Sequence, residues 1–385
     1  MSDMSSLRSR LRGIGIASSV SPKPSKPAAG LEIRENATTA DERLFHLGAA
    51  GMKRLECVDA EPDIERILFL DTETTGLSGG VGTVAFLLGL GWVRGTDFHT
   101  RQILMKDYAS EDMLIGELTR AAEDFDMVVT FNGNTFDLPL LNTRCTMNRR
   151  EYPLEDMDTL DLLKHSRRLW KRRLGSVRLT RLEEEILGYE READLPGSEA
   201  PERYFEYLRT GDMSVLEEVI EHNRHDIISM SSLLCALCAC YDEPDRLCDS
   251  ADQLSMAITL EKQGERDVAE RLYESAERYV PATSIAALRS RPSREKAAVE
   301  LDRMLRQQGR DEERFRHLER MISAGTGGMF PYTQMAKYHE HELRDLKTAL
   351  RYANRALELS DALSRDSAQK RVNRLKKRLK NREEE

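Results

Sequence analysis

The sequence predicts an α/β domain with a central mixed sheet, followed by an all-α domain. An uninterrupted apolar run over residues 67–70 is typical of a strand that is buried on both faces. Patterns of strand, strand, strand, helix, strand and helix follow one another from residue 67 onward, which is an α/β layout. After Pro244 the sequence changes to helical segments with alanines at regular spacing, so we expect a separate helical domain there.

Length and composition fit this two-domain interpretation. The chain of 385 residues is long enough for two hydrophobic cores. Hydrophobic residues make up 40% and charged residues 32%, which favours a soluble protein with a helix-rich, charged portion. No run approaches the roughly 18 apolar residues of a membrane span, so we expect a cytoplasmic protein without a membrane partner. The net charge of -9 argues against nucleic-acid binding by the whole surface, so a polyanion must contact a local patch.

We expect three regions along the chain. Residues 1–60 form a largely disordered or irregular N-terminal region, in which 1–30 are a mildly basic tail and 41–55 a possible short helix. Residues 61–243 form the α/β domain. Residues 244–385 form the helical domain, which ends in a basic helix.

Two carboxylates follow the first apolar strand. Asp71 and Glu73 are two apart, so their side chains project together from the end of that strand. Adjacent carboxylates repel each other unless a cation lies between them, and Mg²⁺ or Mn²⁺ prefers oxygen ligands. The pair therefore predicts half of a metal site, although a strand that simply runs into a turn would show the same residues.

The next elements complete the α/β pattern. The sequence predicts a hairpin, a helix that Ser110 caps, a further strand, and a helix with Asp137 in its first turn. These elements cover 84–93 with 98–105, 110–125, 127–131, and residues from about 136 onward. Ligands of open α/β sheets bind outside the carboxyl ends of the strands, so we expect the site there.

A basic segment lies within the predicted helices over 158–188, where Thr180 and Glu183 form a capping box and Gly188 ends the helix. Eight cations and no acid occur between Lys164 and Arg181. Such a run is either a solvated face or a contact surface for phosphates. Trp170 lies among these cations and either stacks on the bases of a single strand or belongs to the core.

The long helix predicted over 214–241 carries His222 and Asp226 four residues apart, on one face. Isolated histidines on helices more often pack or cap than catalyse. The cysteines at 235, 238 and 240 continue an apolar helical run and have no matching Cys/His pair, so we expect reduced core thiols.

Two stretches of the second half, 255–281 and 335–359, resemble tetratricopeptide repeat units in their spacing of small residues. The sequence between them is irregular. We expect a small helical domain that packs on itself or on the first domain and docks a partner protein or a long substrate. The basic segment 370–385 carries one apolar stripe, which favours capping of this domain over nucleic-acid binding.

Three motifs appear in the order of those of the DEDD, or DnaQ-like, 3′-5′ exonucleases, which have a ribonuclease H-like fold. They are Asp71 with Glu73, FNGNTFDLPLL at 131–141, and HNRHDI at 222–227. The segments TGLSGG at 75–80, LWKRRLG at 169–175 and RYFEYLRTGD at 203–212 resemble the bacterial YprB-type ribonuclease H-like proteins more narrowly. The resemblance spans about residues 60–240.

This resemblance implies four metal ligands, Asp71, Glu73, Asp137 and Asp226, that hold two divalent cations, Mg²⁺ or Mn²⁺. It implies His222 as the general base, although the family has a Tyr four residues before the last Asp or a His five before it. The predicted substrate-binding residues are Thr74, Asn132, Phe136, Trp170, Lys171, Arg172 and Arg173.

The resulting hypothesis is a metal-dependent exonuclease that acts from the 3′ end of single-stranded DNA or RNA. A non-catalytic nucleic-acid or protein adaptor on the same fold is one alternative, but an adaptor has little need of four mutually repelling acids. An endonuclease is another, because this fold supports both cutting modes. Whether the substrate is DNA or RNA depends on contacts to the sugar 2′ position, which the sequence does not locate.

Overall fold

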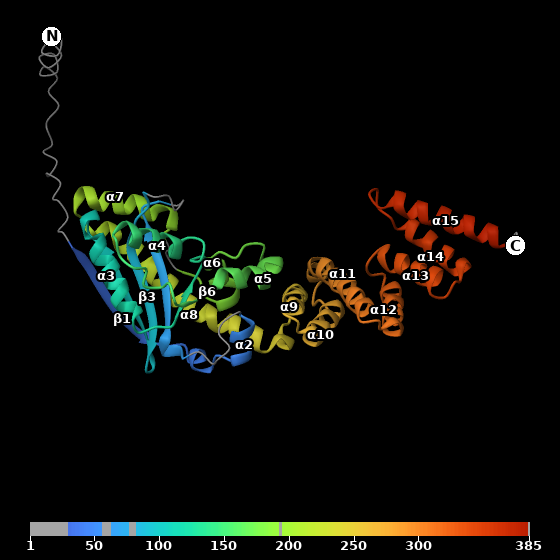
Figure 1. Ribbon diagram of the computed structural model, residues 1–385, viewed down its shortest axis with the longest axis horizontal. Coiled ribbons are helices and arrows are strands. Elements are labelled where there is room, and N and C mark those ends of the chain that lie inside the picture. The colour runs from blue at the N-terminus through green and yellow to red at the C-terminus, as the bar shows by residue number, and fades with distance from the viewer. Residues whose placement is uncertain (1–29, 56–62, 77–81, 192–194, 384–385) are drawn as a thin grey trace, which may run out of the picture.

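The structure is a computed structural model that describes residues 30–55, 63–76, 82–191 and 195–383. Figure 1 shows a sheet flanked by helices at one end of an elongated molecule and a succession of helices that leads away from it. This architecture confirms the predicted fold class, an α/β part followed by an all-α part. Among the described residues, no helix combines the length and apolarity that a membrane crossing requires.

The sheet has six strands in the order β1-β4-β3-β2-β5-β6. The strands are β1 (Leu31–Thr39), β2 (Ile67–Thr74), β3 (Ala85–Arg94), β4 (Asp97–Met105), β5 (Met127–Thr130) and β6 (Asp158–Asp161). Strands β1 to β4 pair antiparallel, whereas β2, β5 and β6 run parallel to one another. The carboxyl ends of these three parallel strands therefore meet at one edge, where the sequence predicted the site.

Two strands correct the sequence analysis. Residues 31–39, interpreted as irregular, form β1, an edge strand paired along its whole length with β4. Residues 158–161, interpreted as helical, form β6 at the opposite edge. Both strands have few buried apolar residues, because each pairs with another strand on one side only. The predicted tail over 1–29 lies outside the described residues.

Two predicted helix caps are also wrong. The Ser110 hydroxyl does not cap α3 (Glu111–Ala122) but donates to Asp107 Oδ1 and accepts from the Gly30 amide. Thr180 lies inside the short helix α6 (Leu179–Leu182), which continues into a single π-helical turn over Glu183–Leu187. Gly188 ends this turn in the left-handed region, as the sequence predicted.

Helices cover both faces of the sheet. One face carries α3, α4 (Asp137–Met147) and α7 (Ala200–Thr210). The other carries α2 (Ala49–Arg54), α5 (Leu162–Leu174) and most of α8 (Glu217–Asp242), and its core continues without a break into the first helices beyond the sheet.

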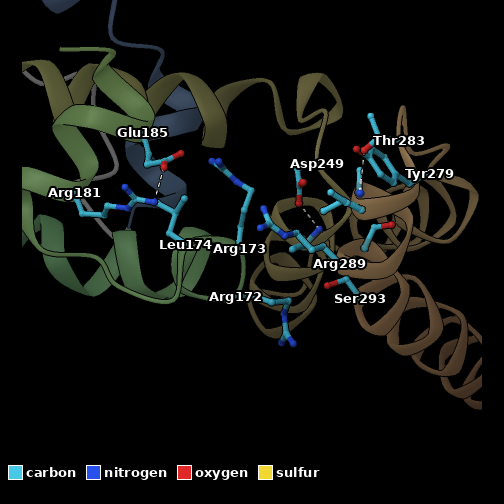
Figure 2. Close-up of a pocket in the computed structure, with 14 residues that line it drawn as sticks. Arg172, Arg173, Leu174, Arg181, Glu185, Asp249, Tyr279, Thr283, Arg289 and Ser293 are labelled. Carbon is cyan, nitrogen blue, oxygen red and sulfur yellow. Dashed lines mark hydrogen bonds and ion pairs between the residues drawn. The ribbon is translucent and has the colours of Figure 1, made fainter. Parts of the chain in front are cut away.

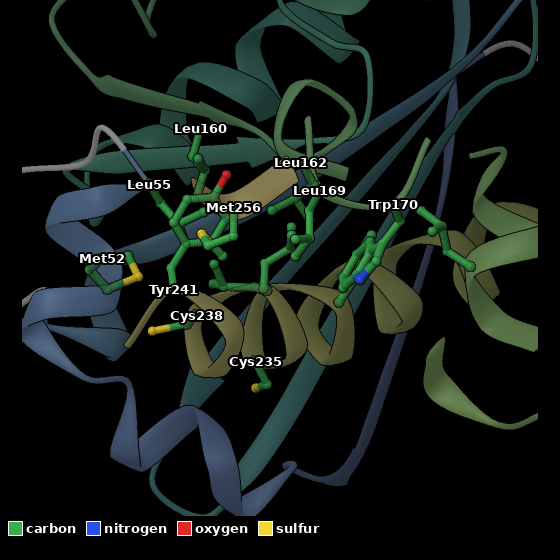
Figure 3. Close-up of a cluster of buried hydrophobic side chains, with 14 of the residues drawn as sticks. Met52, Leu55, Leu160, Leu162, Leu169, Trp170, Cys235, Cys238, Tyr241 and Met256 are labelled. Carbon is green, nitrogen blue, oxygen red and sulfur yellow. The ribbon is translucent and has the colours of Figure 1, made fainter. Parts of the chain in front are cut away.

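Figure 3 shows the centre of this second core, where Trp170 and Met256 lie among side chains from α2 and α8. Trp170 is only 2% exposed, so the core interpretation of this residue holds and its prediction as a substrate-binding residue is wrong. Cys235 and Cys238 are buried in the same core, as expected, and burial raises the pKa of the Cys238 thiol to about 11. Cys240 is half-buried.

Helix α8 approaches β3 very closely because two glycines face it. A Cβ atom on Gly89 would lie 2.3 Å from Asn223 Oδ1, and one on Gly91 would lie 2.4 Å from Ile227 Cγ2. The two glycines are two apart on a strand and the two α8 residues are four apart on a helix, so both pairs meet at one crossing. This crossing sets the position of the intervening Asp226.

Seven helices follow, each packed on the next: α9 (Ser250–Lys262), α10 (Arg266–Arg278), α11 (Ser284–Gln307), α12 (Asp311–Ala324), α13 (Phe330–His341), α14 (Leu346–Glu358) and α15 (Arg365–Glu383). Helix α9 also packs on α5, which joins the helical part to the sheet part. The apolar stripe of α15 is buried, with Val372 and Leu375 against α14. The tetratricopeptide interpretation of these helices stays a prediction.

Replacement of Trp170 by alanine should lower the free energy of unfolding by about 3–5 kcal/mol, because the indole fills a core that cannot collapse around the cavity. Urea denaturation monitored by circular dichroism measures the change. The neighbouring Lys171 is exposed, so Lys171→Ala should change the free energy by less than about 0.5 kcal/mol. Equal effects of the two substitutions would contradict the core position of Trp170.

Candidate active site

Asp71 lies at the carboxyl end of β2 and is the centre of the candidate site. Its Oδ2 accepts a hydrogen bond from Asn223 Nδ2 at 2.8 Å. Burial raises the pKa of Asp71 well above its ordinary value, and the negative charges of Asp226, Asp137 and Glu73 raise it further. The structure therefore brings the other three predicted metal ligands near Asp71, although the four residues come from three separate elements.

Glu73 follows Thr72 in β2, and the Thr72 side chain contacts Asp137 of α4. Glu73 is buried at a bulge in β2, where the pairing with β3 shifts register between Glu73 and Thr74. Asp137 is the first residue of α4, where the helix N-terminus favours a negative charge. The Thr72 hydroxyl donates a hydrogen bond to Asp137 Oδ1. Burial raises the pKa of Asp137 to about 6.

Asp226 is held by an arginine that the sequence analysis did not identify. Arg191 Nη2 lies 2.5 Å from Asp226 Oδ1 and 2.5 Å from Glu183 Oε1. The Arg191 and Glu183 side chains are only 5% and 1% exposed. Burial raises the pKa of Asp226, while its interactions with His222 and Arg191 act to lower that pKa. Glu183 begins the π-helical turn, a feature that often marks functional sites.

His222 lies one turn before Asp226 on α8 and contacts two of these groups. Its Nδ1 is 3.3 Å from Arg191 Nη1, and its Nε2 is 3.7 Å from Asp226 Oδ2. A guanidinium can only donate, so Nδ1 accepts and the ring proton of neutral His222 is on Nε2, facing Asp226. The imidazole also borders an open cavity of about 490 Å³ beside Leu195 and Pro196.

Two buried amide side chains, Asn223 and Gln102, orient Asp71 and form what we call the amide brace. The sequence analysis did not identify them. Asn223 is fully buried, and its Oδ1 accepts from Gln102 Nε2 at 2.8 Å while its own amide donates to Asp71. Gln102 Nε2 also donates to the carbonyl oxygen of Ile220 at 2.7 Å. Gly89 leaves the space that Asn223 fills. A glycine inside the apolar run of β3 is the sequence signal that could have indicated such a close approach.

The donor set suits hard divalent cations, because every predicted ligand is a carboxylate and their charges act on one another around Asp71. In the described part of the chain, however, no three His, Cys, Asp or Glu side chains are arranged to bind one ion together. Protein donors hold three of the four carboxylates instead: Asn223 on Asp71, Thr72 on Asp137, and Arg191 on Asp226. The residues thus fit a divalent metal in their chemistry, while Asp226 is engaged by a cation of the protein itself.

The predicted substrate residues divide into two groups. Thr74, Asn132 and Phe136 lie near the carboxylates in the chain. The Thr74 hydroxyl donates to the carbonyl oxygen of Gly76. Asn132 has a left-handed backbone conformation, and its backbone N–H donates to Asp161 Oδ1 at the end of β6. Phe136 is half-buried beside Asp137. Their contacts with a substrate stay predictions.

The second group lies on α5, the helix that packs on α9 of the helical part. Lys171 and Arg172 are exposed, whereas Arg173 is paired with Asp252 of α9 through an Nε to Oδ2 distance of 2.7 Å. This ion pair ties α5 to α9. The basic segment is therefore partly structural.

Comparison with known proteins agrees with this architecture. Residues 68–238 match the family model of the RNase_H superfamily, so the sheet part of the chain is an RNase H superfamily domain. The uncharacterized protein YprB of Bacillus subtilis (strain 168) is 31% identical over 320 residues, which are 81% of this chain and 75% of YprB. The chain belongs to the YprB family of RNase H superfamily proteins.

Among solved structures, the family B DNA polymerase of the hyperthermophilic archaeon Pyrobaculum calidifontis is similar with a TM-score of 0.37 and 15% sequence identity. The similarity covers 57% of this chain and 29% of the polymerase, so this chain spans less than a third of that protein.

The raised pKa of Asp137 predicts a pH dependence of stability. Between about pH 4 and pH 6 the folded protein holds the Asp137 proton more tightly than the unfolded chain does, so the free energy of unfolding falls as pH rises through that interval. In EDTA, the free energy of unfolding of Asp137→Asn should fall by roughly 2–3 kcal/mol less over this interval than that of the unmodified protein. Urea denaturation at pH 4.5 and pH 7 measures the two free energies. The control Asp124→Asn, at an exposed position outside the site, should leave the fall unchanged. An unchanged fall in Asp137→Asn would contradict the burial of this carboxyl in its neutral form.

Proposed function

We propose that this protein hydrolyses phosphodiester bonds of single-stranded nucleic acid from the 3′ end, with two Mg²⁺ or Mn²⁺ ions, as a DEDD-type exonuclease. The observation that carries the proposal is the gathering of Asp226, Asp137 and Glu73 around Asp71 at the carboxyl edge of the sheet. Four buried or half-buried carboxylates in one place destabilise a fold unless cations or protons neutralise them. The match to the RNase H superfamily over the same residues supports this interpretation.

In this proposal Asp71, Glu73, Asp137 and Asp226 hold the cations. Bound divalent ions lower the pKa of water and stabilise the charge that develops on phosphate oxygens during hydrolysis. Asn223 fixes the orientation of Asp71 through its amide, and Thr72 does the same for Asp137 through its hydroxyl. These donors leave one oxygen of each carboxylate directed elsewhere, so they position ligands without replacing them.

His222 is the proposed general base, because it lies beside Asp226 and borders an open cavity. In the present arrangement its unprotonated Nδ1 is occupied by the Arg191 contact. Proton acceptance by His222 thus requires that Arg191 release Nδ1. If Asp226 held a cation, its hydrogen bond with Arg191 would also be lost, and one movement of Arg191 would account for both changes.

The pairing of Arg191 with Asp226 also favours a second candidate, a non-catalytic adaptor that binds nucleic acid or a protein through the helical part. An arginine can neutralise a carboxylate permanently, and a protein with that arrangement has no need of metal. Metal binding distinguishes the two candidates directly. Under either candidate the successive helices α9 to α15 offer a docking surface for a partner protein, with a tetratricopeptide-like arrangement as our interpretation.

Isothermal titration with Mn²⁺ should show binding to the unmodified protein, because the ion relieves the repulsion around Asp71. Asp71→Asn and Asp226→Asn should each weaken this binding by about tenfold or more, since each removes a ligand. Asp124→Asn, which removes an exposed carboxylate elsewhere, should not. No heat of Mn²⁺ binding to the unmodified protein would favour the adaptor.

Digestion of 5′-labelled single-stranded DNA and RNA with Mn²⁺ or Mg²⁺ should give products that shorten progressively from the 3′ end. EDTA should abolish the reaction, and Asp71→Asn should slow it by about a hundredfold or more because the charge that holds the cations is lost. Asp124→Asn again serves as the matched control. The polymer that is degraded identifies the substrate as DNA or RNA.

A circular single strand tests the cutting mode. An exonuclease leaves it intact, so its cleavage would replace the proposal by an endonuclease. Failure to cleave any linear strand with either metal would contradict hydrolytic activity altogether.

A further inference from the structure

Two adjoining hollows lie where the sheet part meets the helical part. The larger, of about 720 Å³, lies between the end of α5 with α6 on one side and the start of α11 on the other. The smaller, of about 350 Å³, lies between α5 and α9. Arg172 lines both hollows, which we together call the junction groove, and Figure 2 shows the larger of the two.

The junction groove is positively charged although the whole chain carries a net charge of -9. Its cations come from both parts of the chain: Arg168, Arg172, Arg173, Arg181, Lys262 and Arg289. Its carboxylates are only Glu185 and Asp249. Six cations against two carboxylates concentrate positive potential at this junction, which attracts a polyanion.

The cations of the groove differ in what they already bind. Arg173 is paired with Asp252 and Arg181 with Glu185, so both are partly neutralised within the protein. Arg172 and Arg289 are exposed, and the described residues include no ion pair of either side chain. Figure 2 shows that Arg172 extends from α5 and Arg289 from α11, so the two arginines come from different parts of the chain. Two available guanidinium groups along one hollow suit successive phosphates of one backbone.

An aromatic ring lines the same hollow. Tyr279, which follows α10, is half-buried on the wall of the larger hollow, with the exposed Ile285 beside it. Aromatic side chains among cations are typical of surfaces that bind single strands, because bases stack on the ring while cations contact the phosphates. Tyr279 thus has the accessibility that the buried Trp170 lacks.

The junction groove is connected to the candidate active site through one short segment. Arg181, on the groove wall, is two residues from Glu183, which pairs with the Arg191 that holds Asp226. Helix α6 and its π-helical turn therefore present one side to the groove and the other to the carboxylates.

We propose that the junction groove binds the backbone of a single-stranded nucleic acid, with Arg172 and Arg289 on its phosphates and Tyr279 stacked on a base. The helical part then contributes directly to substrate binding, in addition to any role in docking a protein. This inference rests on the proposed nuclease function for the identity of its ligand. Its test uses binding without cleavage, so the two can fail separately.

The experiment measures fluorescence anisotropy of a labelled single-stranded oligonucleotide with the full chain in EDTA, at several salt concentrations. The double variant Arg172→Gln with Arg289→Gln should bind about tenfold more weakly at low salt. Log affinity falls as log salt rises, and each phosphate contact adds about 0.7 to the steepness of that fall for a single strand. The loss of two contacts should therefore make the slope less steep by about 1.4. The double variant Arg149→Gln with Arg320→Gln removes one exposed arginine from each part of the chain outside the groove, and should match the unmodified protein.

Tyr279 gives a second, independent test, because its contribution does not depend on salt. Tyr279→Leu should weaken binding about tenfold with an unchanged salt slope, and Tyr279→Phe should restore it. Circular dichroism melts check that each variant folds. The proposal would be overturned if the control double variant weakened binding as much as the groove double variant. It would also be overturned if the unmodified protein did not bind at low salt. If binding depends on the groove residues but the protein cleaves no strand, the groove proposal is supported and the proposed nuclease function is contradicted.

Discussion

The mutual repulsion of the carboxylates around Asp71 is the constraint on which the rest of the site depends. Negative charges placed together in a buried region raise the pKa of Asp71 and oppose folding unless the surrounding structure compensates. The compensation comes from three directions, with an amide from α8, a hydroxyl from β2 and a guanidinium from the segment after the π-helical turn. Each donor fixes one carboxylate, so the charges are held apart.

The same arrangement explains why the sheet and α8 are so closely joined. Asn223 reaches Asp71 only because Gly89 offers no side chain, and Gln102 holds Asn223 in the one orientation that donates to Asp71. A larger residue at position 89 would move α8 outward and carry Asp226 and His222 away with it. The glycine, the amide brace and the carboxylates therefore form one unit, in which a packing requirement and a chemical requirement coincide.

The sequence predicted the elements whose pattern is local and missed those whose role is set by distant partners. Strand β2, the hairpin β3–β4 and helix α8 have clear apolar patterns, Asp71 was predicted from its place at the end of a buried strand, and Asp137 and Asp226 from a family resemblance. Strand β1 has few apolar residues because it is an edge, so only its pairing with β4 defines it. Arg191 has no local signature, and Glu183 matched a capping-box pattern instead of the buried ion pair that the fold gives it. Trp170 shows the remaining limit, because an aromatic in a basic helix has the same sequence context in a core and on a binding surface.

Arg191 connects the charge balance of the site to its proposed chemistry. One guanidinium touches Asp226, Glu183 and His222, so it holds a ligand, a buried acid and the proposed base in a single arrangement. Under the proposed function Asp226 would be one of the carboxylates that hold a cation, and the positive charge beside it would then no longer have to come from Arg191. Glu183 would keep the guanidinium paired if Arg191 left Asp226, and Nδ1 of His222 would become available as a proton acceptor. The charge balance of Asp226 and the availability of the proposed base would therefore both depend on the position of Arg191.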